Sequence, residues 1–202
     1  SKLFVNNNYD VTVLFFESKG GAYKLFEKSG IKCYAFPRGK VFQHAYGAYI
    51  PFSGKKFYRP FIAFYRSVFS ILPTKRMLKK LDPDIVYLNT SLLFPAAIAA
   101  KMLKKKIVWH LREQIHDGNW GFRKQFIRFL FKRLPDEIIA ISKTNASVLN
   151  IPKAKIVYNS VDLKVFSDSV DVKAFKARFD VPNARIISFL GGKILSKGAP
   201  IF

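Results

Sequence analysis

The repeated alternation of short apolar runs with longer amphipathic segments constrains the fold more than any other feature of the chain. The apolar runs are four to seven residues long, which is the usual length of strands and too short for most buried helices. They span residues 10–16, 31–36, 84–88, 107–110, 137–141 and 155–158. Such runs, separated by amphipathic helices, are typical of a parallel sheet that helices cover on both faces. The sequence therefore predicts an α/β fold with right-handed crossovers.

Prolines and capping residues are expected to divide the helical segments. Pro60 suits the first turn of a helix that Pro73 ends or kinks, and Thr74 can then cap a second helix over residues 75–81. Ser91 and Ser142 each follow an apolar run and precede a helical pattern, so both are candidate N-caps.

Two helical patterns combine aromatic and basic residues, over residues 59–72 and 122–134. Their apolar stripes consist of Phe61, Phe64, Tyr65, Val68 and Leu72, and of Phe122, Phe126, Phe129, Leu130 and Leu134. Two interpretations are open. Either the stripes pack on the sheet beneath a solvated basic face, or the basic amphipathic segments over residues 55–81 and 123–133 dock on an anionic bilayer.

The charge balance indicates an anionic partner. The 202 residues include 35 Lys and Arg against 13 Asp and Glu, a net charge of +22, and twelve of the bases lie between Lys28 and Leu81 without an acid. Because 50% of the residues are hydrophobic and 16% aromatic, a disordered basic tail is excluded. Nucleic acid, an anionic lipid surface and a phosphorylated ligand all fit this charge. Cys33 is the single cysteine, and no Cys and His cluster has the spacing of a zinc site, so we expect no bound metal.

Polar residues follow the predicted strands at their carboxyl ends, where ligands bind in parallel α/β sheets. They are Asn89, Thr90, His110, Arg112, Glu113, Ser142, Asn159 and Asp162. His110 is either a cleft residue or a structural histidine. Arg112 and Glu113 either position an acceptor or form a surface ion pair, which would add little stability. Asn159 and Asp162 are expected to shape a turn, with substrate contact as the second possibility.

Six segments occur in the order found in retaining glycosyltransferases of the GT-B fold, family 4. In the first half, Asp10–Leu14 resembles the family's second strand, Pro83–Leu88 its strand PDIVHLH, and Trp109–Glu113 the loop with a cleft-facing histidine. In the second half, Pro135–Ser142 resembles ADxIIAxS, Lys155–Asp162 with Phe166 resembles kixVIxNGVDxxxF, and Phe189–Gly198 resembles FVGRLxxxKG.

The resemblance implies a Rossmann-like parallel sheet with helices on both faces, which is the GT-B N-terminal domain, followed by the first strand and loop of a second Rossmann-like domain. Residues 1–160 would form the acceptor-side domain without its first strand, 161–184 the interdomain junction with a lead-in helix, and 185–202 the start of the donor-binding domain. On this interpretation the chain is truncated at both ends and inactive by itself.

The resemblance also implies a reaction, the transfer of a sugar from a nucleotide-diphosphate donor with retention at the anomeric carbon and without a bound cofactor. His110 would be catalytic, and Gly191, Lys193 and Lys197 would bind the donor diphosphate, whose developing charge cations and backbone N–H groups can neutralise. The family usually has Arg where Gly192 stands. Solvated surface lysines are the alternative for Lys193 and Lys197.

The resemblance places Asn89, Thr90, Arg112, Glu113 and Ser142 in the acceptor cleft, and Asn159 and Asp162 at the interdomain junction. The expected partners are a nucleotide sugar, a lipid-linked or glycan acceptor of cell-surface polysaccharide or lipopolysaccharide synthesis, and an anionic membrane. The expected location is the cytoplasm, peripherally at the inner face of the membrane. Two alternatives are a basic nucleic-acid-binding module and an inactive GT-B partner subunit. Nucleic acid is not expected, because the aromatic residues fall mostly on helical faces and not on an exposed strand platform.

Overall fold

The computed structural model describes residues 7–16, 19–41, 58–115, 117, 121–161, 163, 171–180 and 185–187. The chain divides into a unit of residues 1–157 and a unit of residues 158–202. Among the described residues, the first unit contains all the strands and most of the helices.

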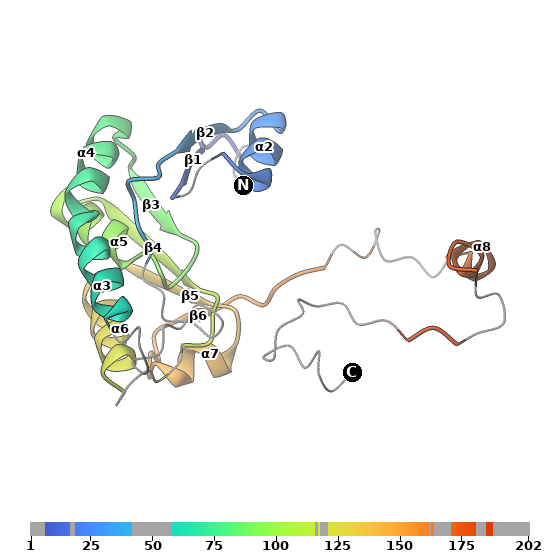
Figure 1. The fold of residues 1–202 in the computed structure, drawn as a ribbon. Helices are drawn as coiled ribbons and strands as arrows, with labels where there is room; N and C mark the ends of the chain where they lie inside the picture. The colour runs from blue at the N-terminus through green and yellow to red at the C-terminus, as the bar shows by residue number, and fades with distance from the viewer. Residues whose placement is uncertain are drawn as a thin grey trace. The chain divides into compact units, whose positions relative to one another are not determined.

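The described strands of the first unit form two parallel sheets (Figure 1). The smaller sheet pairs β1 (Thr12–Phe15) with β2 (Lys32–Ala35). The larger has the order β3-β4-β5-β6, with bounds Ile85–Leu88, Lys106–Leu111, Glu137–Ala140 and Lys155–Ile156. Every pairing is parallel, and helices connect the neighbouring strands. The predicted parallel α/β fold is therefore confirmed.

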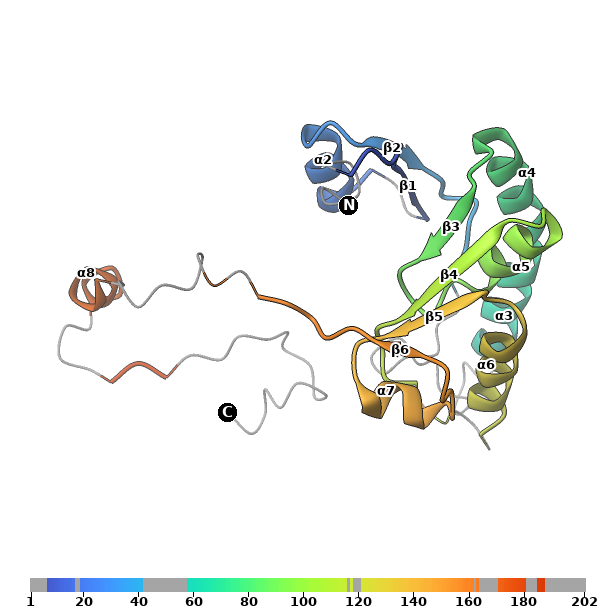
Figure 2. The same ribbon diagram turned by 180° about the vertical axis from the view of Figure 1, so that it is seen from behind.

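The first unit contains six described helices, and three of them begin and end within four residues of the segments predicted over 59–72, 75–81 and 122–134. The six are α2 (Gly21–Lys28), α3 (Arg59–Phe69), α4 (Ile71–Leu81), α5 (Phe94–Met102), α6 (Phe122–Arg133) and α7 (Lys143–Val148). Figures 1 and 2 show α4, α5 and α6 along the same side of the four-stranded sheet. This arrangement leaves the two faces of the sheet in different surroundings.

The side chains of strand β4 alternate between the two faces of the four-stranded sheet. Ile107, Trp109 and Leu111 are completely buried and belong to the hydrophobic core. The Trp109 ring stacks on Phe131 of α6, with ring centroids 4.2 Å apart. His110 lies on the opposite face, which in β3 carries the exposed Tyr87. One face of the sheet therefore supplies the core, and the other carries polar groups that solvent can reach.

The boundary between α3 and α4 corrects the prediction that Pro73 would end the first helix. The break lies at Ser70, which closes α3 and precedes α4, and Pro73 sits in the first turn of α4. Proline is tolerated there because the first N–H groups of a helix have no partner within it. Thr74 is likewise not a cap, since its hydroxyl donates to the Ser70 carbonyl oxygen at 2.7 Å.

Helix α3 buries its small polar residues and exposes its aromatic ones. Ser67, Ser70 and Thr74 are 0–3% exposed, and their hydroxyls donate to carbonyl oxygens one turn earlier. The aromatic stripe of α3, as we name it, consists of Phe61, Tyr65 and Phe69 together with Leu72 at the start of α4, each 58–62% exposed. Packing of this stripe on the sheet, the first of the two predicted interpretations, is therefore wrong for these residues. Phe64 is different, since it contacts Phe94 and Phe126.

Helix α6 confirms its predicted stripe in part. Leu130 is buried, and Phe126 and Leu134 pack against the core, whereas Phe122 and Phe129 are exposed. The buried face also includes Ile127 and Phe131, because Phe131 stacks on Trp109, a partner that only the assembled sheet provides.

The second unit contains the short helix α8 (Val172–Ala177), which Asp171 caps by accepting a hydrogen bond from the Ala174 N–H at 3.0 Å. Residues 185–187 are described and are not in a strand, and the other residues expected to form the first strand of the donor-binding domain fall outside the described residues. The assignment of residues 161–184 to a junction and of 185–202 to the start of a donor-binding domain stays a prediction.

Candidate functional site

The site is built where β3 and β4 end, on the sheet face away from the core. The register pairs Tyr87 with Val108, and His110 follows Val108 by two residues, so Tyr87 and His110 lie on the same face of the sheet. The Tyr87 hydroxyl and His110 Nδ1 are 2.7 Å apart, and the two rings meet edge to face. Parallel pairing therefore joins a phenol and an imidazole that are 23 residues apart in sequence.

The protonation of this pair follows from its surroundings. Burial lowers the pKa of His110, the positive charge of Arg112 lowers it further, and Glu113 opposes them. Burial also raises the pKa of Tyr87, against the effect of Arg112. At neutral pH both groups are uncharged. We assign the hydrogen bond as Tyr87 O–H donating to Nδ1, since a phenol is the stronger donor, and this tautomer keeps the histidine proton on Nε2.

The second ring nitrogen of His110 is the atom of the site that is available to hydrogen-bond a ligand. Nε2 is buried and has no hydrogen-bond partner among the described residues. A buried polar atom without a partner is unfavourable by about 1–3 kcal/mol, so such atoms in folded proteins call for an explanation. A ligand oxygen that accepts from Nε2–H would satisfy it.

Glu113 ties together the segments that follow β3 and β4. Its Oε2 accepts hydrogen bonds from the Ser91 backbone N–H at 3.0 Å and from the Ser91 hydroxyl at 2.7 Å. Ser91 is completely buried. The prediction of Ser91 as an N-cap is therefore wrong: its hydroxyl binds Glu113, and α5 begins after Leu93 without a side-chain cap.

Arg112 and the residues after β3 complete the arrangement. Arg112 is exposed, and its Nη1 lies 3.4 Å from the side-chain oxygen of Asn89. The Thr90 carbonyl oxygen accepts a hydrogen bond from the Trp109 indole at 2.8 Å, which connects the site to the core beneath it. Among the described residues, Arg112 and Glu113 form no ion pair with each other, so the alternative of a surface pair is wrong. Asn89, Thr90, His110, Arg112 and Glu113 are thus brought together, as predicted from their positions after the strands.

Comparison of the sequence with known families gives one match. The model of Glycosyltransferase Family 4 matches residues 1–165. The chain belongs to this family. No curated protein matches the chain. Among solved structures, it is similar to the crystal structure of MurG from Acinetobacter baumannii, with 16% sequence identity and a TM-score of 0.49 over 78% of this chain and 39% of that chain. The chain thus spans well under half the length of that protein.

Ser142 takes the capping role that its position predicts. Its hydroxyl accepts from the Asn145 N–H at 3.1 Å and lies 2.6 Å from the Asn145 side-chain oxygen, so α7 is capped as expected. Contact between Ser142 and an acceptor stays a prediction for this family 4 chain.

The remaining predicted residues belong to the second unit, residues 158–202. Gly191, Lys193, Lys197 and Asp162 fall outside the described residues. Asn159 is described and exposed, in the second unit. Within the described part of the chain, no group of three His, Cys, Asp or Glu side chains could hold a metal ion, and no helix is long and apolar enough to cross a membrane.

Two residues of the site were missed by sequence reasoning. Tyr87 was assigned only to a strand, and Ser91 only to a cap. The available signal for Tyr87 is its place as the next-to-last residue of the apolar run 84–88. In the sheet it lies on the same face as His110, near the end of the neighbouring strand. That shared face depends on the register between β3 and β4, which the sequence does not specify.

Proposed function

We propose that this family 4 chain is the acceptor-side part of a retaining GT-B glycosyltransferase that transfers a sugar from a nucleotide-diphosphate donor to a lipid-linked or polysaccharide acceptor in cell-surface glycan synthesis. The observation that carries the proposal is His110, held by Tyr87 at the carboxyl end of β4 with a buried Nε2 that has no partner among the described residues. A family match that covers residues 1–165 supports it.

His110 would act as a neutral hydrogen-bond donor. Because its pKa is lowered, the ring presents an N–H to an acceptor oxygen without carrying a full charge at neutral pH. Oxygen atoms of a sugar hydroxyl or of the leaving phosphate are suitable partners. A donor that is already oriented stabilises charge that develops in a transition state without further reorganisation.

The donor diphosphate would be bound by Gly191, Lys193 and Lys197, as the resemblance implies. The backbone N–H of a glycine and two lysine side chains would neutralise the diphosphate as the glycosidic bond breaks. The nucleotide sugar is a substrate in this proposal, and no cofactor is required.

Peripheral attachment to an anionic membrane, at its cytoplasmic face, is the second part of the proposal. The aromatic stripe of α3 supports it, because an exposed row of large apolar side chains flanked by Arg59 and Arg66 fits insertion between charged headgroups. Each base near such a surface adds about 1 kcal/mol to the attraction.

The transfer reaction can be tested with the complete reading frame that contains residues 1–202. The protein is incubated with radiolabelled nucleotide-diphosphate sugars and host membranes, and label is measured in the lipid and glycan fractions. We expect transfer from one donor, a loss of about 10²-fold in kcat for His110→Gln, and no comparable loss for the matched variant His116→Gln.

Two outcomes would contradict the proposal. A folded protein that transfers none of the sugars would favour the inactive partner subunit. Inversion at the anomeric carbon, measured by NMR of the product, would contradict the retaining mechanism alone.

A further inference from the structure

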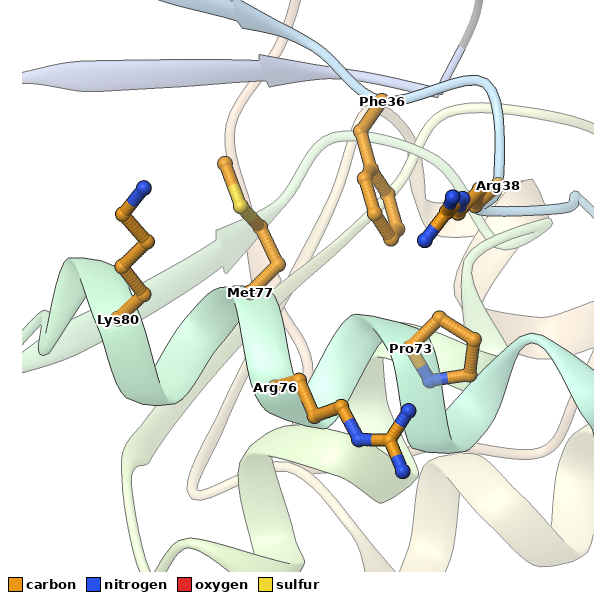
Figure 3. A pocket seen from close by; sticks show the side chains of 6 residues that line it. All are labelled: Phe36, Arg38, Pro73, Arg76, Met77 and Lys80. Carbon is orange, nitrogen blue, oxygen red and sulfur yellow. The ribbon is translucent and has the colours of Figure 1, made fainter.

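A small open pocket of about 250 Å³ lies between the turn that follows β2 and helix α4, and it belongs neither to the Tyr87–His110 site nor to any predicted site. Figure 3 shows its lining. Phe36 and Arg38 come from the turn, and Pro73, Arg76, Met77 and Lys80 come from α4.

Three of the six lining residues are cations without a described counter-ion. No ion pair among the described residues involves Arg38, Arg76 or Lys80. The sequence contains no acid between Lys28 and Leu81. Asp82, the next acid along the chain, is bound to Lys105 at 2.7 Å, a contact that lowers the pKa of Asp82. The pocket is therefore electropositive.

The other three residues give the pocket apolar walls. Phe36, Pro73 and Met77 are half-buried, and Figure 3 shows Phe36 pointing from the turn toward α4 and Met77 rising from α4, with the Arg38 guanidinium on the Phe36 side and the Lys80 ammonium group on the Met77 side. An inorganic anion would use only the cations. A ligand that uses the whole pocket carries both a strong negative charge and a short hydrocarbon segment.

The turn that carries Arg38 is held in place. The Phe36 N–H donates to the Phe15 carbonyl oxygen at 2.7 Å, and the Gly39 N–H closes the turn onto the Phe36 carbonyl oxygen at 3.1 Å. The Phe36 ring packs edge to face on Phe16, and a Cβ at Gly39 would collide with both rings. Glycine is thus required for this turn, and Arg38 is presented from a fixed backbone.

We propose that this pocket binds the phosphate group of a membrane lipid, a phosphate monoester or diphosphate headgroup together with its first hydrocarbon carbons. A headgroup with two or more negative charges can be shared by several cations. The volume is below that of most sites for drug-sized ligands, so it suits a headgroup and not a whole nucleotide sugar. The choice of a lipid rests on the membrane attachment proposed above, because the exposed aromatic stripe runs to Leu72, next to Pro73.

Binding to a soluble lipid phosphate tests the pocket separately from the transfer reaction. Calorimetry with dihexanoyl phosphatidic acid compares the wild-type chain with the double variant Arg38→Gln/Lys80→Gln. The matched control is Lys143→Gln/Lys153→Gln, which removes two exposed charges on and just beyond α7. We expect an affinity loss of at least tenfold in the pocket variant and under twofold in the control. An equal loss in both variants would overturn the site in favour of general electrostatic attraction.

Further binding measurements distinguish a lipid phosphate from other phosphate-containing ligands. Inorganic phosphate should bind at least tenfold more weakly than the lipid phosphate, and Met77→Ser should weaken only the lipid. Equal affinity for inorganic phosphate would contradict a ligand that carries a hydrocarbon segment. Stronger binding of a single-stranded oligonucleotide would contradict a lipid ligand. Vesicles with phosphatidic acid should bind more protein than vesicles of equal charge with phosphatidylglycerol, and equal binding would count against a phosphate-monoester pocket.

The two proposals fail independently in these measurements. Binding of lipid phosphate by a protein that transfers no sugar would leave the pocket intact and contradict the enzyme. Sugar transfer by a protein whose lipid binding is unchanged in both double variants would support the enzyme and contradict the pocket.

Discussion

The two faces of strand β4 separate the stability of this protein from its proposed chemistry. On one face, Ile107, Trp109 and Leu111 are completely buried beneath helices. On the other, His110 meets the Tyr87 hydroxyl and keeps Nε2 without a partner among the described residues. Consecutive residues of one strand thus belong to different surroundings. Substitutions on the first face should act on folding, and those on the second on ligand binding.

The largest effect is expected for Trp109→Ala. The substitution removes the ring that stacks on Phe131 and leaves a cavity in the core, so the free energy of unfolding should fall by about 3–5 kcal/mol. Chemical denaturation monitored by circular dichroism measures it. Val108→Ala, the neighbouring substitution on the other face, should lower the same quantity by about 1 kcal/mol. Equal losses would mean that the two faces do not differ in the way described.

A smaller loss of stability is expected for Ser91→Ala. The Glu113 carboxylate loses the hydroxyl donor at 2.7 Å, and a hydrogen bond to a charged group contributes about 1.5–3 kcal/mol. The matched variant Ser147→Ala removes an exposed hydroxyl on α7 and should change stability by less than about 0.5 kcal/mol. If Ser91→Ala lowers the free energy of unfolding as little as Ser147→Ala, the Ser91–Glu113 hydrogen bond does not stabilise the fold.

The protonation of His110 should make stability depend on pH. Its pKa is lowered in the folded state, so below the unfolded-state pKa of about 6.5 the unfolded chain binds more protons. The contribution of neutral His110 is complete above that pH and is lost as the pH falls through the folded-state pKa. His110→Gln should flatten this part of the stability profile. A profile identical to that of the wild type would contradict the assignment.

Tyr87→Phe should act on His110 with little effect on stability. Removing the donor to Nδ1 destabilises the neutral imidazole, so the pKa of His110, followed by NMR titration of its ring protons, should rise toward its ordinary value. An unchanged pKa would show that Tyr87 does not set the tautomer.

The smallest effect on stability is expected at the aromatic stripe of α3. Phe61→Ser/Tyr65→Ser alters side chains that are 60% and 62% exposed, so unfolding should change by less than about 0.5 kcal/mol per site. Cosedimentation with anionic vesicles should nevertheless fall several-fold. The control Phe179→Ser alters a residue that is 61% exposed on the second unit and should sediment like the wild type. Unchanged cosedimentation of the double variant would show that the aromatic stripe of α3 does not contribute to membrane binding.

Strand positions were largely predictable from sequence, because parallel strands buried by helices are read as short apolar runs. The runs at 84–88 and 107–110 coincide with β3 and β4 within two residues. Helix faces were less predictable. The hydrophobic stripe of α3 faces outward, because Ser67, Ser70 and Thr74 satisfy their hydroxyls within the helix backbone and can be buried.

The residues of the site were predictable in part, from their places after the strands. Their partners were not. Whether Arg112 meets Glu113 or Asn89, and whether Ser91 caps a helix or binds Glu113, depends on how two loops pack after the strands have paired. Pairwise contacts of this kind follow from the register and not from local propensity.

The open nitrogen of His110 has a consequence for selectivity. The unfavourable energy of a buried donor without a partner is recovered only by a molecule that brings an acceptor oxygen to that point. A deoxygenated analogue of the same size would occupy the space and leave the donor unsatisfied. Sites of this type reject such analogues far more strongly than apolar pockets reject a missing methylene. Comparison of deoxy and fluoro sugars would therefore identify which oxygen of the ligand lies beside β4.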